Sequence, residues 1–244
     1  MEVTDSLNFD HKDRKDIYEY IERHGTVRED EVRRALNFDP AALGTHLTIL
    51  RRDGYIRKVG NHVQVAYAPG EEEVHTLDDL DVTIRMAQDV DLESLVEAIH
   101  EVADEGTYIE AETVADIIDH EEVVLRHNEL SSRMVFVATT DDHLAGWVHL
   151  DLPEAEKLSH TAVLTVGTRS KFRGHGIGSK LLDRGVRWAR EHGFEKLYNS
   201  VPATNEGAIT FLEEHGWETE AVRENHYKIN GEYVDEVMMA FSLR

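Results

Sequence analysis

Residues 165–182 read TVGTRSKFRGHGIGSKLL and join two segments with different apolar patterns. The apolar run at residues 162–166 predicts a strand, and three glycines at alternate positions follow it, Gly174, Gly176 and Gly178. Helical spacing then relates Leu181, Leu182, Val186, Trp188 and Ala189. A strand, a glycine turn and a helix start aim free backbone N–H groups at one point, and the helix dipole adds to their attraction for an anion. The stretch therefore predicts a binding site for phosphate or pyrophosphate.

The spacing of the glycines separates the possible phosphate ligands. A P-loop requires Gly-x-x-x-x-Gly-Lys-Ser/Thr, but here Ser179 precedes Lys180. A dinucleotide fingerprint requires Gly-x-Gly-x-x-Gly, whereas this chain has Gly-x-Gly-x-Gly. The segment instead resembles the acetyl-CoA signature of the GNAT N-acetyltransferases, Arg/Gln-x-x-Gly-x-Gly/Ala, which Arg173, Gly176 and Gly178 match. The alternative is a glycine-rich strand-to-helix turn that binds no ligand.

Further motifs extend this resemblance over about residues 82–244. Residues 205–209 (NEGAI) and 215–217 (HGW) follow in the family's order, and residues 223–227 with 235–239 look like the end of the ribosomal-protein alanine acetyltransferase type. The resemblance implies an α+β fold with a mixed, mostly antiparallel sheet flanked by helices. The patterns predict strands at residues 82–86, 133–139, 144–150, 162–166, 196–201, 217–222 and 233–241. They predict the intervening helices at about residues 89–99, 110–128, 178–189 and 206–215.

Acetyl-CoA as acyl donor and an amine as acceptor are what the resemblance implies. The expected cofactor-binding residues are Val166, Thr168, Arg173, Gly174, His175, Gly176, Ile177, Gly178, Ser179 and Asn205. Asn205 would hydrogen-bond near the reactive end of the cofactor, although the sequence equally allows it to cap the following helix.

The family's usual catalytic groups are missing from their positions. The tyrosine expected seven residues after Asn205 is Leu212, and the glutamate base of the alanine acetyltransferase type is Ser200. We therefore predict Tyr227 as the general acid, with Asn205 beside the reacting group. The candidate bases are Glu110, Glu112 and Asp235, or a water relayed by His149 or His160.

The first 70 residues have a different pattern. Helices are predicted at residues 13–24, 28–36 and 40–53, followed by a hairpin of strands at residues 55–59 and 63–67. Three helices and a hairpin resemble a winged helix-turn-helix domain, which implies contact with double-stranded DNA through residues 28–60. The predicted contacts are Thr45, His46, Thr48, Arg51 and Arg52. A dimerisation module, or a domain that covers a substrate site, is the alternative.

Charge is divided unevenly along the 244 residues. The net charge is −23, of which residues 1–70 contribute −1 and residues 71–244 contribute −22. We predict two domains, residues 1–70 and 82–244, joined by an acidic linker at residues 71–81. The acidic balance favours either a solvated surface or adaptation to high salt.

The composition also excludes several classes of site and location. There is no cysteine, and no His-x-x-x-His or His-Glu-x-x-His spacing occurs, so we expect no metal site. No apolar run approaches a membrane span and no signal peptide pattern opens the chain, which predicts a soluble, cytoplasmic protein without a membrane partner.

The two resemblances imply two alternative functions. The first is an acetyl-CoA-dependent N-acetyltransferase with an appended DNA-binding-like domain. The second is a transcription regulator whose acetyltransferase-like half senses acetyl-CoA without efficient catalysis. A homodimer formed through residues 1–70 is compatible with either function.

Overall fold

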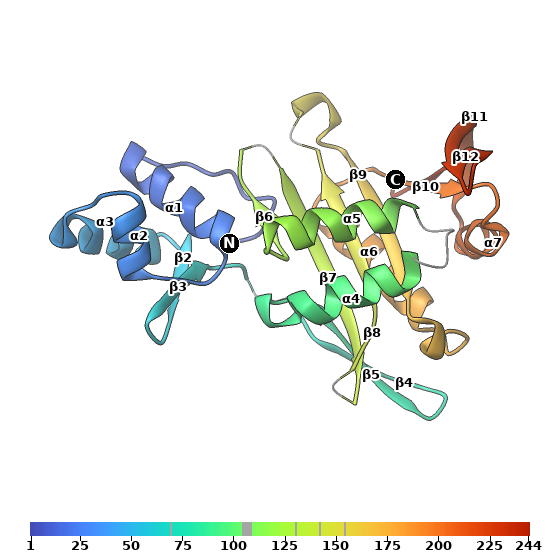
Figure 1. Cartoon of the computed structure of the whole chain (residues 1–244), viewed down its shortest axis with the longest axis horizontal. Helices are drawn as coiled ribbons and strands as arrows, with labels where there is room; N and C mark the ends of the chain where they lie inside the picture. Colours follow the sequence, from blue (N-terminus) through green and yellow to red (C-terminus); the bar gives the residue numbers. More distant parts are fainter. Residues whose placement is uncertain (69, 104–108, 130, 142, 154) are drawn as a thin grey trace.

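The computed structural model describes residues 1–244 except residues 69, 104–108, 130, 142 and 154 and the side chain of Glu110. The chain forms a small N-terminal helical domain and a larger domain built on one sheet (Figure 1). In Figure 1 the N-terminal domain lies at one end of the molecule, and the hairpin of β11 and β12 lies at the other.

The N-terminal domain contains three helices and a three-stranded sheet in the order β1-β3-β2. Asp39 begins the third helix by accepting hydrogen bonds from the N–H groups of Ala41 and Ala42, and Pro40 follows it at the first helical position. The apolar faces of the helices pack together in one core, and Tyr18 and Leu47 are among the side chains fully buried in it. The elements are α1 (Lys12–His24), β1 (Val27–Arg28), α2 (Glu29–Ala35), α3 (Pro40–Arg52), β2 (Ile56–Val59) and β3 (His62–Val65).

The large sheet has nine strands, and eight of them follow the order β11-β12-β10-β9-β8-β7-β5-β4. Among the described strands, β9 and β10 form the one parallel pair, so the expected mixed, mostly antiparallel sheet is confirmed. The strands are β4 (Glu73–Leu77), β5 (Leu80–Met86), β6 (Arg126–His127, paired with β7), β7 (Ser132–Thr140), β8 (His143–Leu152), β9 (Thr161–Thr168), β10 (Lys196–Pro202), β11 (Glu218–Ile229) and β12 (Glu232–Ser242).

Two expected boundaries were wrong. The segment at residues 71–81 is not a linker, because it forms β4 and the start of β5 at the edge of the large sheet. The helix expected to reach residue 128 ends at Glu121. The carbonyl groups of Val123 and Val124, which a longer helix would use internally, accept hydrogen bonds from the guanidinium of Arg133 instead.

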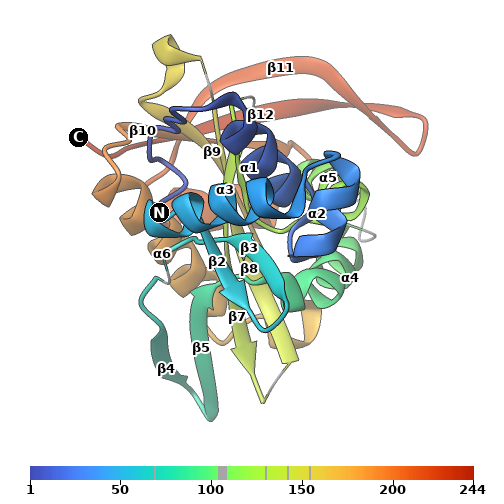
Figure 2. The same ribbon diagram turned by 90° about the vertical axis from the view of Figure 1, so that its left-hand side faces the viewer.

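Helices cover both faces of the sheet. Helices α4 (Leu92–Ala103) and α5 (Ile109–Glu121) lie on one face and α6 (Ile177–Glu191) lies on the other (Figures 1 and 2). A side chain at Gly185 of α6 would collide with Val148 and Leu164, so the glycine allows this helix to approach the sheet closely. Helix α7 (Glu206–Glu214) follows β10, and short 3-10 turns occupy Asp89–Asp91, Glu156–Leu158 and Ser170–Phe172. None of the described helices is long and apolar enough to cross a membrane.

The N-terminal domain is docked on the larger domain by buried polar contacts. Glu22 of α1 is 3% exposed and lies 3.0 Å from the guanidinium of Arg126 on β6. The same carboxylate accepts hydrogen bonds from the N–H of His127 at 3.1 Å and the side chain of Asn128 at 3.0 Å. Tyr18 adds a hydrogen bond of 2.8 Å to the carbonyl of His127. These contacts join α1 of the N-terminal domain to β6 and the residue that follows it in the larger domain.

Candidate active site

The parallel strands β9 and β10 separate partway along their length. They pair over Thr161, Ala162 and Val163 of β9 and no further, although both strands continue. The side-chain amide of Asn199 on β10 donates a hydrogen bond of 2.6 Å to the carbonyl of Leu164, just where the strands part. Because backbone groups alternate sides along a strand, Val166 and Thr168 turn their N–H and C=O groups to this same gap.

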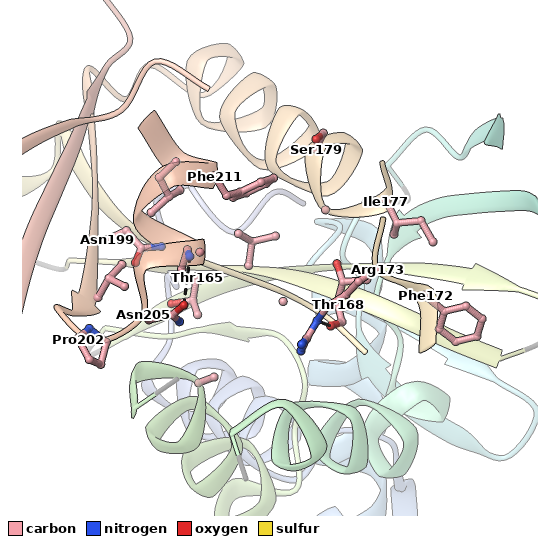
Figure 3. A pocket seen from close by; sticks show the side chains of 18 of the residues that line it. Thr165, Thr168, Phe172, Arg173, Ile177, Ser179, Asn199, Pro202, Asn205 and Phe211 are labelled. Carbon is pink, nitrogen blue, oxygen red and sulfur yellow. Dashed lines mark hydrogen bonds between the residues drawn. The ribbon is translucent and has the colours of Figure 1, made fainter. Parts of the chain in front are cut away.

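A cavity of about 450 Å³ occupies the gap between the separated strands. Figure 3 shows Asn199, Asn205 and Pro202 at one end of it and Thr168, Arg173 and Phe172 at the other. The walls come from β9, the start of α6, β10, α7 and the N-terminal end of α5, to which Ile109 and Ala111 belong. The long shape and the two different ends suit an extended ligand.

One end of the cavity lies at the start of α6, whose first turn has no side-chain cap. Gly176 is the N-cap of α6 with φ of 80°, and no side chain caps the first turn of that helix. Gly174 also has a left-handed φ, of 84°, which favours glycine at both positions. The N–H groups of the first turn therefore remain available, and the helix dipole reinforces them. Arg173 lines the same end and donates a hydrogen bond of 2.9 Å to the carbonyl of Thr168.

Nine of the ten residues predicted to bind the cofactor line this cavity, and His175 does not. His175 instead lies with Nδ1 2.8 Å from a carboxylate oxygen of Asp78, on the turn between β4 and β5. Asn205 is the N-cap of α7, as one of its two alternative roles predicted, and it also lies at the cavity. It lines the cavity, and its side-chain oxygen accepts a hydrogen bond of 3.1 Å from the N–H of Ala208 as the N-cap of α7.

The two positions that lack the family's usual catalytic groups also lie at the cavity. Leu212 and Ser200 are both lining residues. Tyr227, the predicted acid, is opposite Val234 in the hairpin of β11 and β12 and does not belong to the described wall. Among the described residues that line the cavity, Arg173 has the one ionisable side chain.

The predicted bases whose side chains the structure describes are not among the lining residues. Glu112 is exposed on α5, and the side chain of Glu110 is outside the described residues. Asp235 accepts a hydrogen bond of 2.7 Å from the N–H of Asn225. His149 is buried on β8, and this burial, with the nearby Arg133, lowers its pKa to about 3. His160 lies in a second hollow beside Glu195 and Lys196.

The predicted DNA contacts lie on α3. Thr45, Thr48, Arg51 and Arg52 are exposed. His46 is not, since its side chain is 15% exposed and faces α1, with Nε2 3.6 Å from a carboxylate oxygen of Asp13. The expectation that His46 belongs to the exposed face was therefore wrong, because its ring packs against those of His11 and Phe38.

The structure adds Asn199 to the residues predicted from sequence. Its side chain is 9% exposed, lines the cavity and hydrogen-bonds at the point where the strands separate. One signal was present in the sequence, namely a polar residue in the strand at residues 196–201 at a position that alternation assigns to the buried face. A buried amide requires a hydrogen-bond partner, which here is a backbone carbonyl.

Comparison with known proteins agrees with this arrangement. The chain is 28% identical over 106 residues to N-alpha-acetyltransferase 50 of Danio rerio, a match that covers 43% of this chain and 61% of that protein. The match thus spans less than two thirds of the relative's length.

Solved structures show the same fold. A GNAT-family acetyltransferase from Streptococcus pneumoniae superposes with a TM-score of 0.54 at 20% identity, over 66% of this chain and 99% of that one. An acetyltransferase from Salmonella typhimurium, solved with acetyl-CoA, superposes with a TM-score of 0.55 at 19% identity, over 67% of this chain and 94% of that one. The sequence model of the acetyltransferase (GNAT) family matches residues 96–217. Since that match covers half of the chain, the protein belongs to the acetyltransferase (GNAT) family.

Proposed function

We propose that this protein transfers an acetyl group from acetyl-CoA to an amine. The observation that supports this most directly is the cavity between β9 and β10, which ends at the uncapped N-terminus of α6. Family membership and the N-acetyltransferase relative agree with this activity.

The cavity fits acetyl-CoA in its chemistry. The N–H groups at the start of α6, near Gly176 and Gly178, would hold the pyrophosphate. The backbone of Val166 and Thr168 would pair with the amides of the pantetheine arm, as an added strand does. When bound, acetyl-CoA supplies an activated acyl group. Asn199 and Asn205 would lie at the end where that group arrives, because they are at the opposite end of the cavity from Arg173 (Figure 3).

Two measurements test the proposal. Calorimetry with acetyl-CoA should show binding at a single site, and CoA thiol release with a panel of amines and N-terminal peptides should exceed the rate without an acceptor. Binding without thiol release would favour the acetyl-CoA sensor over the enzyme. Absence of binding would contradict both.

We further propose that the exposed face of α3 contacts double-stranded DNA. This helix lies on the outer side of the N-terminal domain, away from the large sheet (Figures 1 and 2). Arg51 and Arg52 are exposed there, although Arg52 also donates a hydrogen bond of 2.7 Å to Asp53.

A gel-shift assay with the Arg51→Ala, Arg52→Ala double variant tests this contact. Arg190→Ala, which removes an exposed arginine of α6, is the control. Retardation lost in the double variant alone would support the DNA contact. Equal retardation of both variants would refute it. In size-exclusion chromatography, an elution volume that shifts with protein concentration would instead indicate a homodimer.

A further inference from the structure

An acetyl acceptor that arrives as an ammonium ion must lose a proton before its nitrogen can attack a thioester. The described cavity wall offers no side chain for this step, since its one ionisable group is the guanidinium of Arg173. An arginine stays protonated and cannot act as a base at neutral pH. The side chain of Glu110, between the lining residues Ile109 and Ala111, lies outside the described residues, so the candidate here is the described carboxylate nearest in the sheet register.

Strand β12, which pairs with β10, carries the buried carboxylate of Glu236. The residue is 3% exposed and pairs across the sheet with Pro202, which lines the cavity. Ser200, another lining residue, pairs with Met238 two positions further along β12. Residues directly opposite each other, and those two apart on one strand, project from the same face of a sheet. Glu236 and Ser200 therefore share a face, as diagonal neighbours separated by roughly 7–8 Å.

This shared face is the one covered by α5. Thr165 of β9 is opposite His149 in the register, and Gly167 is opposite Trp147, whose ring covers it. These residues face away from α6, which packs on Val148 and Leu164. The parallel register places Tyr198, and hence Ser200, on the same side as Val163 and Thr165. An acceptor that enters beside α5 would meet Ser200 and Glu236 together.

Two side chains of β11, those of Arg223 and His226, contact the Glu236 carboxylate. Its Oε2 lies 3.0 Å from Nη1 of Arg223 and 3.5 Å from Nε2 of His226. A register shift separates Arg223 from Tyr227, and His226 lies within it. In the same segment the Asp235 carboxylate accepts a hydrogen bond from the N–H of Asn225. A β-bulge redirects side chains locally, and His226 here contacts Glu236.

We propose that Glu236 is the general base of the acetyl transfer, an assignment that rests on the proposed function. The carboxylate accepts one proton from the acceptor ammonium, directly or through one water, and becomes a carboxylic acid. The freed nitrogen forms a bond to the acetyl carbon, the carbon–sulfur bond breaks, and the thiolate leaves with the electron pair. The thiolate takes the second proton lost by the nitrogen, so that the products are an amide and a thiol.

A purely structural ion pair with Arg223 is the competing explanation of the buried carboxylate. Glu236→Gln removes the base but keeps the shape of the side chain. Arg223→Met breaks the ion pair but keeps the base. Glu220→Gln is the control, because Glu220 of β11 pairs with Lys196 of β10 and does not belong to the described cavity wall.

The measurements are kcat, KM for acetyl-CoA and the thermal midpoint of each variant. We expect Glu236→Gln to lower kcat by about 10²–10⁴-fold, the usual contribution of a general base, with KM for acetyl-CoA within threefold of the wild type. Arg223→Met should keep at least about a tenth of kcat. Glu220→Gln should leave kcat unchanged.

A carboxylate placed at another position of the shared face should restore the kcat lost in Glu236→Gln, which a purely structural role of Glu236 would not predict. Ser200→Glu in the Glu236→Gln background should recover kcat at least tenfold, because position 200 lines the same cavity. A kcat for Glu236→Gln within threefold of the wild type would overturn the assignment of Glu236 but not the proposed function. So would equal losses in Glu236→Gln and Arg223→Met without rescue. A wild-type protein that transfers no acetyl group would overturn the proposed function as well.

Discussion

Replacing Glu22 with glutamine should weaken the contact between the two domains. The Glu22 carboxylate is 3% exposed and accepts from three donors, the Arg126 guanidinium, the His127 N–H and the Asn128 amide, at 3.0–3.1 Å. A glutamine keeps the volume but turns an N–H₂ group toward this set of donors. It also removes the negative charge that faces Arg126.

The size of the effect follows from what remains after the change. Removing one partner of a buried ion pair costs about 3–5 kcal/mol, because the other charge stays buried without compensation. Arg126 retains a second carboxylate, that of Glu121 at 3.0 Å, which moderates the loss. We therefore expect a decrease of about 3 kcal/mol in the free energy of unfolding.

Urea denaturation followed by tryptophan fluorescence and by circular dichroism measures this change. The matched control is Glu129→Gln, since Glu129 pairs with Lys15 across the same interface at 2.5 Å but is 60% exposed. The urea midpoint of the control should equal that of the wild type within experimental error. If Glu22→Gln changes the midpoint no more than Glu129→Gln does, the buried contact does not stabilise the docked arrangement.

Three further outcomes are expected. In Gly167→Ala the new Cβ would overlap the Trp147 ring and cost about 1–3 kcal/mol of stability, whereas Gly44→Ala, with open space around it inside α3, should stabilise by about 0.5–1 kcal/mol in the same denaturation assay. Burial lowers the pKa of His149 to about 3, so the ring stays neutral in the folded state. Above pH 6.5 its ionisation therefore does not reduce the free energy of unfolding. Below that pH this free energy should fall by up to about 1.4 kcal/mol per unit toward pH 3, and His149→Gln should remove this part of the slope in a pH series of unfolding curves. Molar KCl should raise the thermal midpoint if the net charge of −23 is an adaptation to high salt, and a midpoint indifferent to KCl would contradict that idea.

Local patterns predicted most of the elements of this fold. The helix that begins after Gly176 and the strand before it were recognisable because apolar spacing and glycine positions act over a few residues. The edge strand β4 was missed because an edge needs few buried side chains, and its Val74 is 72% exposed. The end of α5 was missed because residues 123–125 continue the apolar pattern. These residues leave the helix where Arg133 hydrogen-bonds to the carbonyls of Val123 and Val124, and Arg133 belongs to a different predicted element, the strand at residues 133–139.

The glycine-rich end of the cavity was more predictable from the sequence than the end near Asn199, for a related reason. Backbone N–H groups and glycines bind a pyrophosphate, and both come from one continuous stretch that a motif can describe. Asn199 and Glu236 contact other strands, at Leu164 and at Arg223, so their placement depends on register. The sequence shows a glutamate in the last strand but does not show which strand lies beside it.

This dependence on register bears on how an absent catalytic residue is interpreted. A sheet presents one face through several adjacent strands, and positions related by a diagonal lie within one or two side-chain lengths of each other. Ser200 on β10 and Glu236 on β12 are related in this way. A carboxylate can therefore serve the same cavity from either strand while the two positions lie 36 residues apart in the chain. The loss of glutamate at position 200 consequently does not by itself indicate a protein that senses acetyl-CoA without catalysis. The paired variants Glu236→Gln and Ser200→Glu separate the two explanations, because a relocated base predicts recovery and a lost activity predicts none.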